Sequence, residues 1–171
     1  MTGLPPPAPA APQETIVKVA DWAAGRADAV LVTLGLGSCV AIMLHDPRAC
    51  AGAMAHILLP SKSLARDAAN PAKFPETAVP LLVQRLTALG ADPRLLVAKL
   101  AGGASMFAQL MTPGSVQMGE RNIVAVRDVL RRAGIPVTAE AVGGGAGRSV
   151  RFHVADGRVE IRSVGADVIV I

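Results

Sequence analysis

The chain of 171 residues has the length of one ordinary domain and can bury a core without help from metals or disulfides. Hydrophobic residues make up 51% of it and aromatic residues only 2%, while the net charge of +4 is dispersed along the sequence. So few aromatic side chains argue against a nucleic acid platform, and no apolar run approaches the roughly 20 residues that a membrane-spanning helix needs.

The N-terminal segment is rich in proline and alanine. Residues 1–13, MTGLPPPAPAAPQ, bury too little surface to offset the entropy of ordering, so we expect a disordered tail and then a single domain over residues 14–171. The tail lacks the basic start and apolar run of a secretion signal, which predicts a cytoplasmic protein. In that reducing compartment the two cysteines are expected to serve thiol chemistry or to be buried, without forming a disulfide.

The first half of the domain reads as strands. Residues 15–19 and 29–35 are rich in β-branched and aliphatic side chains. Residues 39–45 and 50–59 form two apolar runs around a turn with proline at its second place, which predicts a β-hairpin with its loop at residues 46–49. Residues 61–75 follow as a loop of the length that often serves a functional site.

The second half alternates between helices and strands. Amphipathic helices are predicted over residues 76–90 and 120–134, the latter with Ile123, Val126 and Leu130 facing inward. Strands are predicted at 94–103 and 137–142, and a second hairpin at 150–164 is expected to turn tightly at Asp156-Gly157. This order of elements predicts an α+β domain whose sheets are covered by helices.

The first hairpin places a thiol near an imidazole. If residues 46–49 form the loop, His45 faces Cys50 on the first rung and Cys39 lands opposite His56, with Cβ atoms about 4.5 to 5.5 Å apart. A slip by one residue would move His56 to the other face of the sheet. Free cysteines and histidines are often plain core residues, but this arrangement would also suit a nucleophile whose pKa is lowered by a cationic histidine.

Glycines precede Cys39 at positions 35 and 37. They have an ordinary interpretation as a turn between strands. They would also let the backbone N–H groups of residues 37–39, Gly37 and Ser38 among them, converge where an oxyanion forms during attack on an amide.

Other candidate sites in the sequence are weaker. A zinc site from both cysteines and two histidines is excluded in this hairpin, because the two rungs lie about 20 Å apart at the rise of a strand. The glycine stretches 101–105 and 143–148 lack the endings of a P-loop and of a dinucleotide fingerprint, so they are expected to be flexible loops beside a site. His45, Cys50 and His153 receive no role, and Arg148 could reach a carboxylate or carbonyl.

Six motifs together resemble one family, the chemoreceptor glutamine deamidases of the CheD type. In chain order they are TLGLGSCVAIML, GAMAHILLP, TAVPLL, LVAKLAGGASMF, GERN and GGGAGR. The resemblance extends from about Thr15 to Val164. It implies a fold of packed sheets with helices outside, and a cysteine hydrolase in which Cys39 is the nucleophile, His56 the base and Thr33 the group that orients the histidine.

The resemblance also implies what such a protein acts on. Members convert chosen glutamines on methyl-accepting chemotaxis receptors to glutamate and release ammonia, without a cofactor or metal, and some bind a CheC-type phosphatase. The expected mechanism is thiolate attack, a thioester, and its hydrolysis with His56 as acid and then base. Two alternatives stay open, namely another Cys-His amidase or protease, and a non-catalytic module that binds a receptor or phosphatase.

Overall fold

The computed structural model describes residues 12–106, 110, 114 and 116–171. Most of the predicted tail, residues 1–11, lies outside the described residues, and Gln13 is already the first residue of a strand. No described helix has the length and apolar character needed to cross a bilayer.

Two sheets of five strands form the centre of the molecule. The first sheet has the order β1 (Gln13–Ile16), β3 (Ala29–Leu36), β8 (Arg148–His153), β9 (Val159–Ser163) and β10 (Ile169–Val170). The second has the order β2 (Trp22–Arg26), β5 (Ala51–Ile57), β4 (Val40–Asp46), β6 (Val97–Gly102) and β7 (Val137–Val142). The β1–β3 and β6–β7 pairs are parallel and the others antiparallel, so both sheets are mixed.

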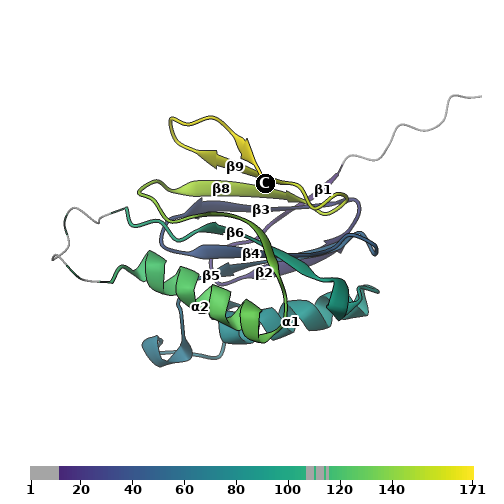
Figure 1. The fold of residues 1–171 in the computed structure, drawn as a ribbon, viewed down its shortest axis with the longest axis horizontal. Helices are drawn as coiled ribbons and strands as arrows, with labels where there is room; N and C mark the ends of the chain where they lie inside the picture. The colour runs from purple at the N-terminus through teal and green to yellow at the C-terminus, as the bar shows by residue number, and fades with distance from the viewer. Residues whose placement is uncertain (1–11, 107–109, 111–113, 115) are drawn as a thin grey trace, which may run out of the picture.

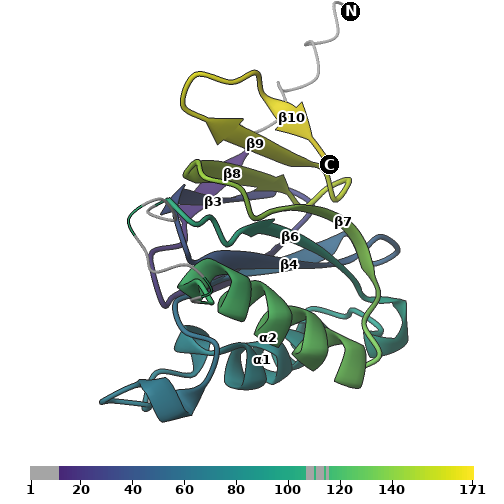
Figure 2. The ribbon, with the colours of Figure 1, turned by 60° about the vertical axis from the view of Figure 1, so that its left-hand side comes forward.

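The two sheets pack face to face through an aliphatic cluster. The inner face of the first sheet contributes Leu31, Leu36 and Phe152, and the second contributes Ala41, Met43 and Met54. Figures 1 and 2 show the resulting layers, with both helices on the same side of the molecule, beneath the second sheet. The predicted α+β class of packed sheets with outer helices is confirmed, and the structure adds that both helices cover one sheet.

The helices α1 (Pro75–Ala88) and α2 (Met118–Arg132) bury one face each against the second sheet. In α2 the predicted inward residues Ile123, Val126 and Leu130 are all buried. Arg131 and Arg132 lie in its last turn, where cations favour the helix dipole. The elements of the described residues also include three short 3-10 helices: η1 (Lys62–Leu64), η2 (Pro71–Lys73) and η3 (Pro93–Leu95). The first two lie inside the predicted loop.

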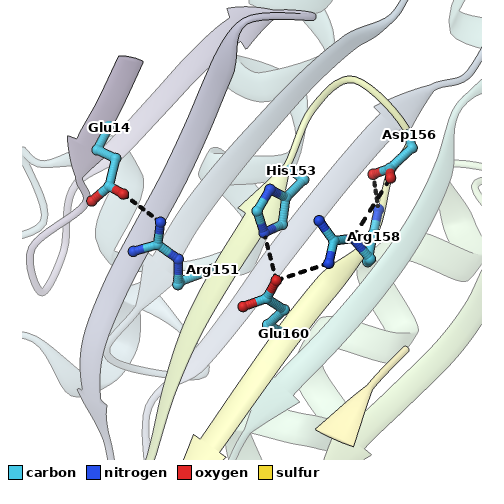
Figure 3. A network of polar contacts seen from close by, with 6 residues as sticks. All are labelled: Glu14, Arg151, His153, Asp156, Arg158 and Glu160. Atoms are coloured by element: carbon cyan, nitrogen blue, oxygen red, sulfur yellow. Dashed lines mark hydrogen bonds and ion pairs between the residues drawn. The ribbon is translucent and has the colours of Figure 1, made fainter. Parts of the chain in front are cut away.

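Charged side chains cover the outer face of the first sheet. Figure 3 shows Arg151 of β8 paired with Glu14 of β1, which lies on the other side of β3. It also shows Glu160 bonded to both His153 and Arg158. Because side chains alternate along a strand, Val150 and Phe152 point into the core from the same strand, as predicted. Such exposed pairs contribute little stability each and instead keep this face polar.

The second hairpin differs from its prediction. The strands β8 and β9 are joined by residues 154–158, a connection longer than the predicted two-residue turn at Asp156-Gly157. Val154 is buried and donates its N–H to Ala29 O at 3.1 Å, so the chain continues into the core before it turns. The strands β2 and β10 were not predicted.

Candidate active site

Thr33 and His56 meet across the interface between the sheets. Thr33 lies on the inner face of β3 and His56 on the inner face of β5, and Thr33 Oγ1 is 2.7 Å from His56 Nδ1. Thr33 Oγ1 also donates to Val17 O at 2.7 Å. A hydroxyl has one proton, so it must accept the second bond from Nδ1–H. The network therefore assigns the neutral His56 the tautomer whose free lone pair is on Nε2.

A β-bulge in β3 sets the direction of the side chains in this part of the strand. Thr33 pairs with Val150 and Leu36 with Arg148, so β3 has one residue more than β8 between these rungs. Gly35 lies in the bulge with a φ of +68°, which favours glycine. The extra residue lets both Thr33 and Leu36 point into the core although they are three positions apart.

The surroundings of His56 keep its ring neutral. Its side chain is fully buried. Its backbone O accepts from Ala20 N–H and its backbone N–H donates to Asp21 O, each at 3.0 Å. Burial lowers the pKa of His56 from its ordinary 6.5 to about 4. Within the described residues, Nε2 is buried and has no hydrogen-bond partner. The ring thus offers an unprotonated, unoccupied acceptor at neutral pH.

The position of Cys39 corrects the predicted register. His56 pairs with Ala41, not with Cys39, and His45 pairs with Gly52, not with Cys50. The cause is the turn, which begins one residue later because Asp46 belongs to β4 and its carboxylate accepts from the N–H groups of Arg48 and Ala49. This moves the register by two residues, so the faces are unchanged.

Cys39 and His56 therefore share one face as diagonal neighbours. Cys39 is half-buried just before β4 and packs against the cluster between the sheets, as Ala41 does. Diagonal neighbours on one face lie about 7–8 Å apart, and their Cβ atoms somewhat less. Among the described residues, Cys39 Sγ makes no hydrogen bond with His56 Nε2. Burial raises the pKa of the Cys39 thiol, and its own backbone N–H opposes that rise.

The loop before Cys39 is tied to the second sheet by its carbonyl groups. Gly37 O accepts from Ala104 N at 2.8 Å and Cys39 O accepts from Gly103 N at 2.7 Å. At Gly102 a Cβ atom would lie 2.3 Å from Cys39 O, so only glycine permits this approach. The stretch 101–105, predicted to be a flexible loop, is instead largely buried and bonded to the loop of residues 37–39.

Asn122 of α2 is a further buried residue beside this loop. Its Nδ2 donates to Ser38 O at 2.9 Å and to Leu58 O at 3.2 Å. It is the last residue of the GERN motif, and no role was predicted for it from the sequence. Its signal was a polar residue four positions before Val126 and eight before Leu130, on the stripe of the helix that faces the core.

The other candidate residues lie away from Cys39 or serve the structure. His45 is a core histidine bonded to Val154 O at 2.9 Å, and Cys50 lies in the turn at the far end of the hairpin. His153 belongs to the outer face (Figure 3). Arg148 binds two carbonyls, Gly102 O and Gly143 O. No three potential metal ligands cluster in the part of the chain that the structure describes.

A cavity of about 420 Å³ borders the loop before Cys39. Its lining includes Gly35, Met106, Gly147 and two arginines, Arg148 and Arg162. Met106 Sδ would lie 3.5 Å from a Cβ placed on Gly37, which connects the cavity to the loop of residues 37–39. Neither Cys39 nor His56 is among its lining residues.

Comparison with known proteins gives one family and several close relatives. The family model described as "CheD chemotactic sensory transduction" matches residues 58–163, a range that begins after Cys39 and His56. The relatives include three proteins named "Probable chemoreceptor glutamine deamidase CheD". The protein of Caldanaerobacter subterraneus subsp. tengcongensis is 40% identical over 87% of this chain and 92% of its own. That of Desulforamulus reducens is 41% identical over 92% and 95%, and that of Moorella thermoacetica 44% identical over 90% and 93%.

The chain is also similar in part to solved structures, of which one is a Bacillus protein. The Bacillus licheniformis hypothetical protein YfiH aligns with a TM-score of 0.42 at 15% identity, over 68% of this chain and 47% of its own.

Proposed function

The chain belongs to the CheD family, and on that premise we propose that it hydrolyses the side-chain amide of selected glutamines on chemotaxis receptors, with Cys39 as nucleophile. One observation carries the assignment of the site. His56, on the same sheet face as Cys39, has Nδ1 held by Thr33 at 2.7 Å and an unoccupied Nε2. A ring fixed at one nitrogen and free at the other is the arrangement of a general base.

Each proposed residue has one task. Cys39 attacks the carboxamide carbon, His56 transfers protons through Nε2, and Thr33 keeps the ring in one orientation and one tautomer. The backbone N–H groups of the loop at Gly37, Ser38 and Cys39 stabilise the oxyanion. In support, the Gly37 and Cys39 carbonyls are bonded to residues 103–104 on the other side of the loop.

The free enzyme holds a neutral pair. The pKa of His56 is about 4 and that of the Cys39 thiol is raised, both because of burial, so no thiolate-imidazolium pair exists before substrate arrives. The proton then leaves sulfur for Nε2 as the carbon–sulfur bond forms. His56 returns this proton to the departing amide nitrogen, which releases ammonia and leaves a thioester. Water deprotonated by Nε2 hydrolyses the thioester to glutamate and restores the thiol.

Sulfur and Nε2 must come closer for this transfer. Catalytic hydrogen bonds are often long before substrate binds, and rotation about χ1 changes the position of a cysteine sulfur. The His56 ring is fully buried and Cys39 is half-buried, so we expect substrate to approach from the side of the thiol.

Partner and location follow from the family. We expect the substrate glutamines on the cytoplasmic domain of a methyl-accepting receptor, and the protein in the cytoplasm, where its two free cysteines would stay reduced. A CheC-type phosphatase as second partner stays a prediction from the resemblance.

Mass spectrometry of a receptor's cytoplasmic domain tests the activity. After incubation with the wild-type protein, specific glutamines should be converted to glutamate, with ammonia released in equal amount and the receptor backbone intact. Cys39→Ala should abolish conversion, because it removes the proposed nucleophile. Cys50→Ala is the matched control, since Cys50 is also half-buried but lies at the opposite end of the hairpin.

Two results would contradict the proposal. Peptide fragments in place of intact deamidated receptor would identify a protease. Full activity in Cys39→Ala would show that the thiol is not the nucleophile. If the wild type converts no glutamine, the alternative of a non-catalytic binding module is favoured.

A further inference from the structure

Asn122 occupies a place where α2 would be expected to carry an apolar side chain. It is fully buried, one i+4 step before Val126 and two before Leu130, which are buried as well. Asparagine is a poor former of helix interiors, and a buried amide is costly unless it is bonded. Its Oδ1 has no partner among the described residues. The stability of α2 therefore does not explain this residue.

The amide of Asn122 bridges the two segments of the proposed site. Both of its bonds go to carbonyl oxygens, which only the nitrogen can serve, so the orientation of the amide is assigned by chemistry. Ser38 immediately precedes Cys39, and Leu58 follows His56 by two residues. One NH₂ group thus links the chain just before the nucleophile to the chain just after the base.

The bond to Ser38 also orients the peptide that precedes the thiol. A trans peptide is planar, so its C=O and N–H point in opposite directions. With Ser38 O held toward α2, the N–H of Cys39 must point away from α2. Among the described residues the backbone N–H of Ser38 has no acceptor and that of Cys39 has none beyond its own thiol, whereas the carbonyls of Gly37, Ser38 and Cys39 are all bonded. Free N–H groups beside a nucleophile are what an oxyanion requires.

The packing of α2 makes this contact rigid. A Cβ on Gly119 would lie 2.5 Å from Gly103 O, so the first turn of α2 rests directly on the loop that binds Cys39 O. A side chain on this turn can therefore hold the loop of residues 37–39 without following its movements.

We propose that Asn122 is a positioning residue for deamidation, whose carboxamide aims the Cys39 N–H at the oxyanion and sets the separation of the Cys39 loop from the end of β5. It touches no substrate and acts through Ser38 and Leu58. The inference rests on the proposed function only in naming the reaction, because its effect on the thiol can be measured without a receptor.

The test uses Asn122→Asp, which keeps the shape of the side chain but removes the NH₂ donor. We expect kcat for receptor deamidation to fall on the order of 10- to 100-fold, less than the 10²- to 10³-fold typical when an oxyanion donor is lost outright. KM should change by no more than about threefold, since a pure loss of transition-state stabilisation leaves substrate binding intact. The kcat of Asn122→Ser, which keeps one donor, should lie between those of the wild type and Asn122→Asp. This variant replaces Asn122→Asp in the test if Asn122→Asp does not fold.

A second measurement needs no receptor. In a Cys50→Ala background, the rate of Cys39 alkylation by iodoacetamide is followed against pH for each variant. The N–H of Cys39 lowers the thiol pKa, so a peptide that has lost its orientation should move the profile to higher pH. Asp46→Asn is the matched control, because Asp46 is also buried and also holds loop backbone, through Arg48, Ala49 and Asp92 at the far end of β4.

The outcomes separate the two proposals. A wild type without deamidase activity overturns the proposed function, while the alkylation profiles still decide the role of Asn122. A folded Asn122→Asp protein with unchanged kcat and an unchanged profile overturns the positioning role. The positioning role is also overturned if Asp46→Asn loses as much kcat as Asn122→Asp at an equal loss of thermal stability.

Discussion

At the scale of single residues, the proposed site differs from a triad that ends in a carboxylate. A carboxylate would stabilise a protonated ring, whereas the Thr33 hydroxyl only orients a neutral one, because its proton is already given to Val17 O. This agrees with the low pKa of His56. The positive charge on His56 therefore develops during the reaction and is absent from the free protein.

Thr33→Ala tests the value of orientation alone. It leaves Nδ1–H and Val17 O without their partner, and an unpaired buried group costs about 1–3 kcal/mol. If that cost falls on the transition state, kcat decreases roughly 10- to 100-fold. Thr33→Ser, which keeps the hydroxyl, should retain most activity. Equal losses for Thr33→Ala, Cys39→Ala and His56→Ala in receptor deamidation would contradict an orienting role.

Single residues also show what sequence alone can find. Cys39 and His56 attract attention as a thiol and an imidazole on adjacent strands. Thr33 does not, because a threonine in a strand is ordinary, and only the family resemblance pointed to it. Asn122 belongs to the GERN motif but received no role, because the apolar positions define the inward stripe of the helix and Asn122 is the polar exception among them.

At the scale of elements, periodic segments were predictable and connections were not. The strand Val137–Val142 and the inward face of α2 follow from local patterns. The register of the hairpin depended on the side chain of Asp46, which accepts from three N–H groups and delays the turn. The observed pairing differs from the predicted one by two residues. Cys39 and His56 therefore lie on the same face, as predicted, but they are not directly opposite each other.

Gly119→Ala tests the contact between α2 and the loop that supports Cys39. The new Cβ would meet Gly103 O at 2.5 Å, a backbone atom that cannot rotate away, so α2 or the loop must shift. Overpacking of this kind typically costs about 1–3 kcal/mol, which urea unfolding measures. Receptor deamidation should fall as well.

The control for this substitution is Gly145→Ala. Gly145 has open space around its Cβ position and no positive φ, so both stability and activity should stay near wild type. If Gly119→Ala retains full stability and full activity, the close approach of α2 has no part in holding the site.

At the scale of the whole molecule, the layers explain why the imidazole is dry. His56 lies between two sheets, with the helices behind one and the charged face of Figure 3 outside the other. Of the two side chains, His56 is fully buried and Cys39 is partly exposed. Enclosure makes the ring a neutral base at physiological pH, but it also couples the folding of the whole domain to the protonation of one residue.

That coupling predicts a pH-dependent stability. The pKa of His56 is about 4 in the folded protein and near its ordinary 6.5 when unfolded, so between these values the unfolded chain binds more protons. Its contribution is complete above about pH 6.5 and is lost as the pH falls toward 4. Between pH 7.5 and 4.5, urea unfolding of the wild type should lose roughly 2–3 kcal/mol through this residue alone.

His56→Gln isolates the effect, because every other histidine and carboxylate is present in both proteins. The variant should lose roughly 2–3 kcal/mol less than the wild type between the two pH values. Parallel pH dependence of the two proteins would mean that His56 titrates normally, and the neutral, unoccupied Nε2 on which the mechanism depends would have to be abandoned. A smaller loss in the variant would connect the acid sensitivity of the fold to the group that moves the proton in catalysis.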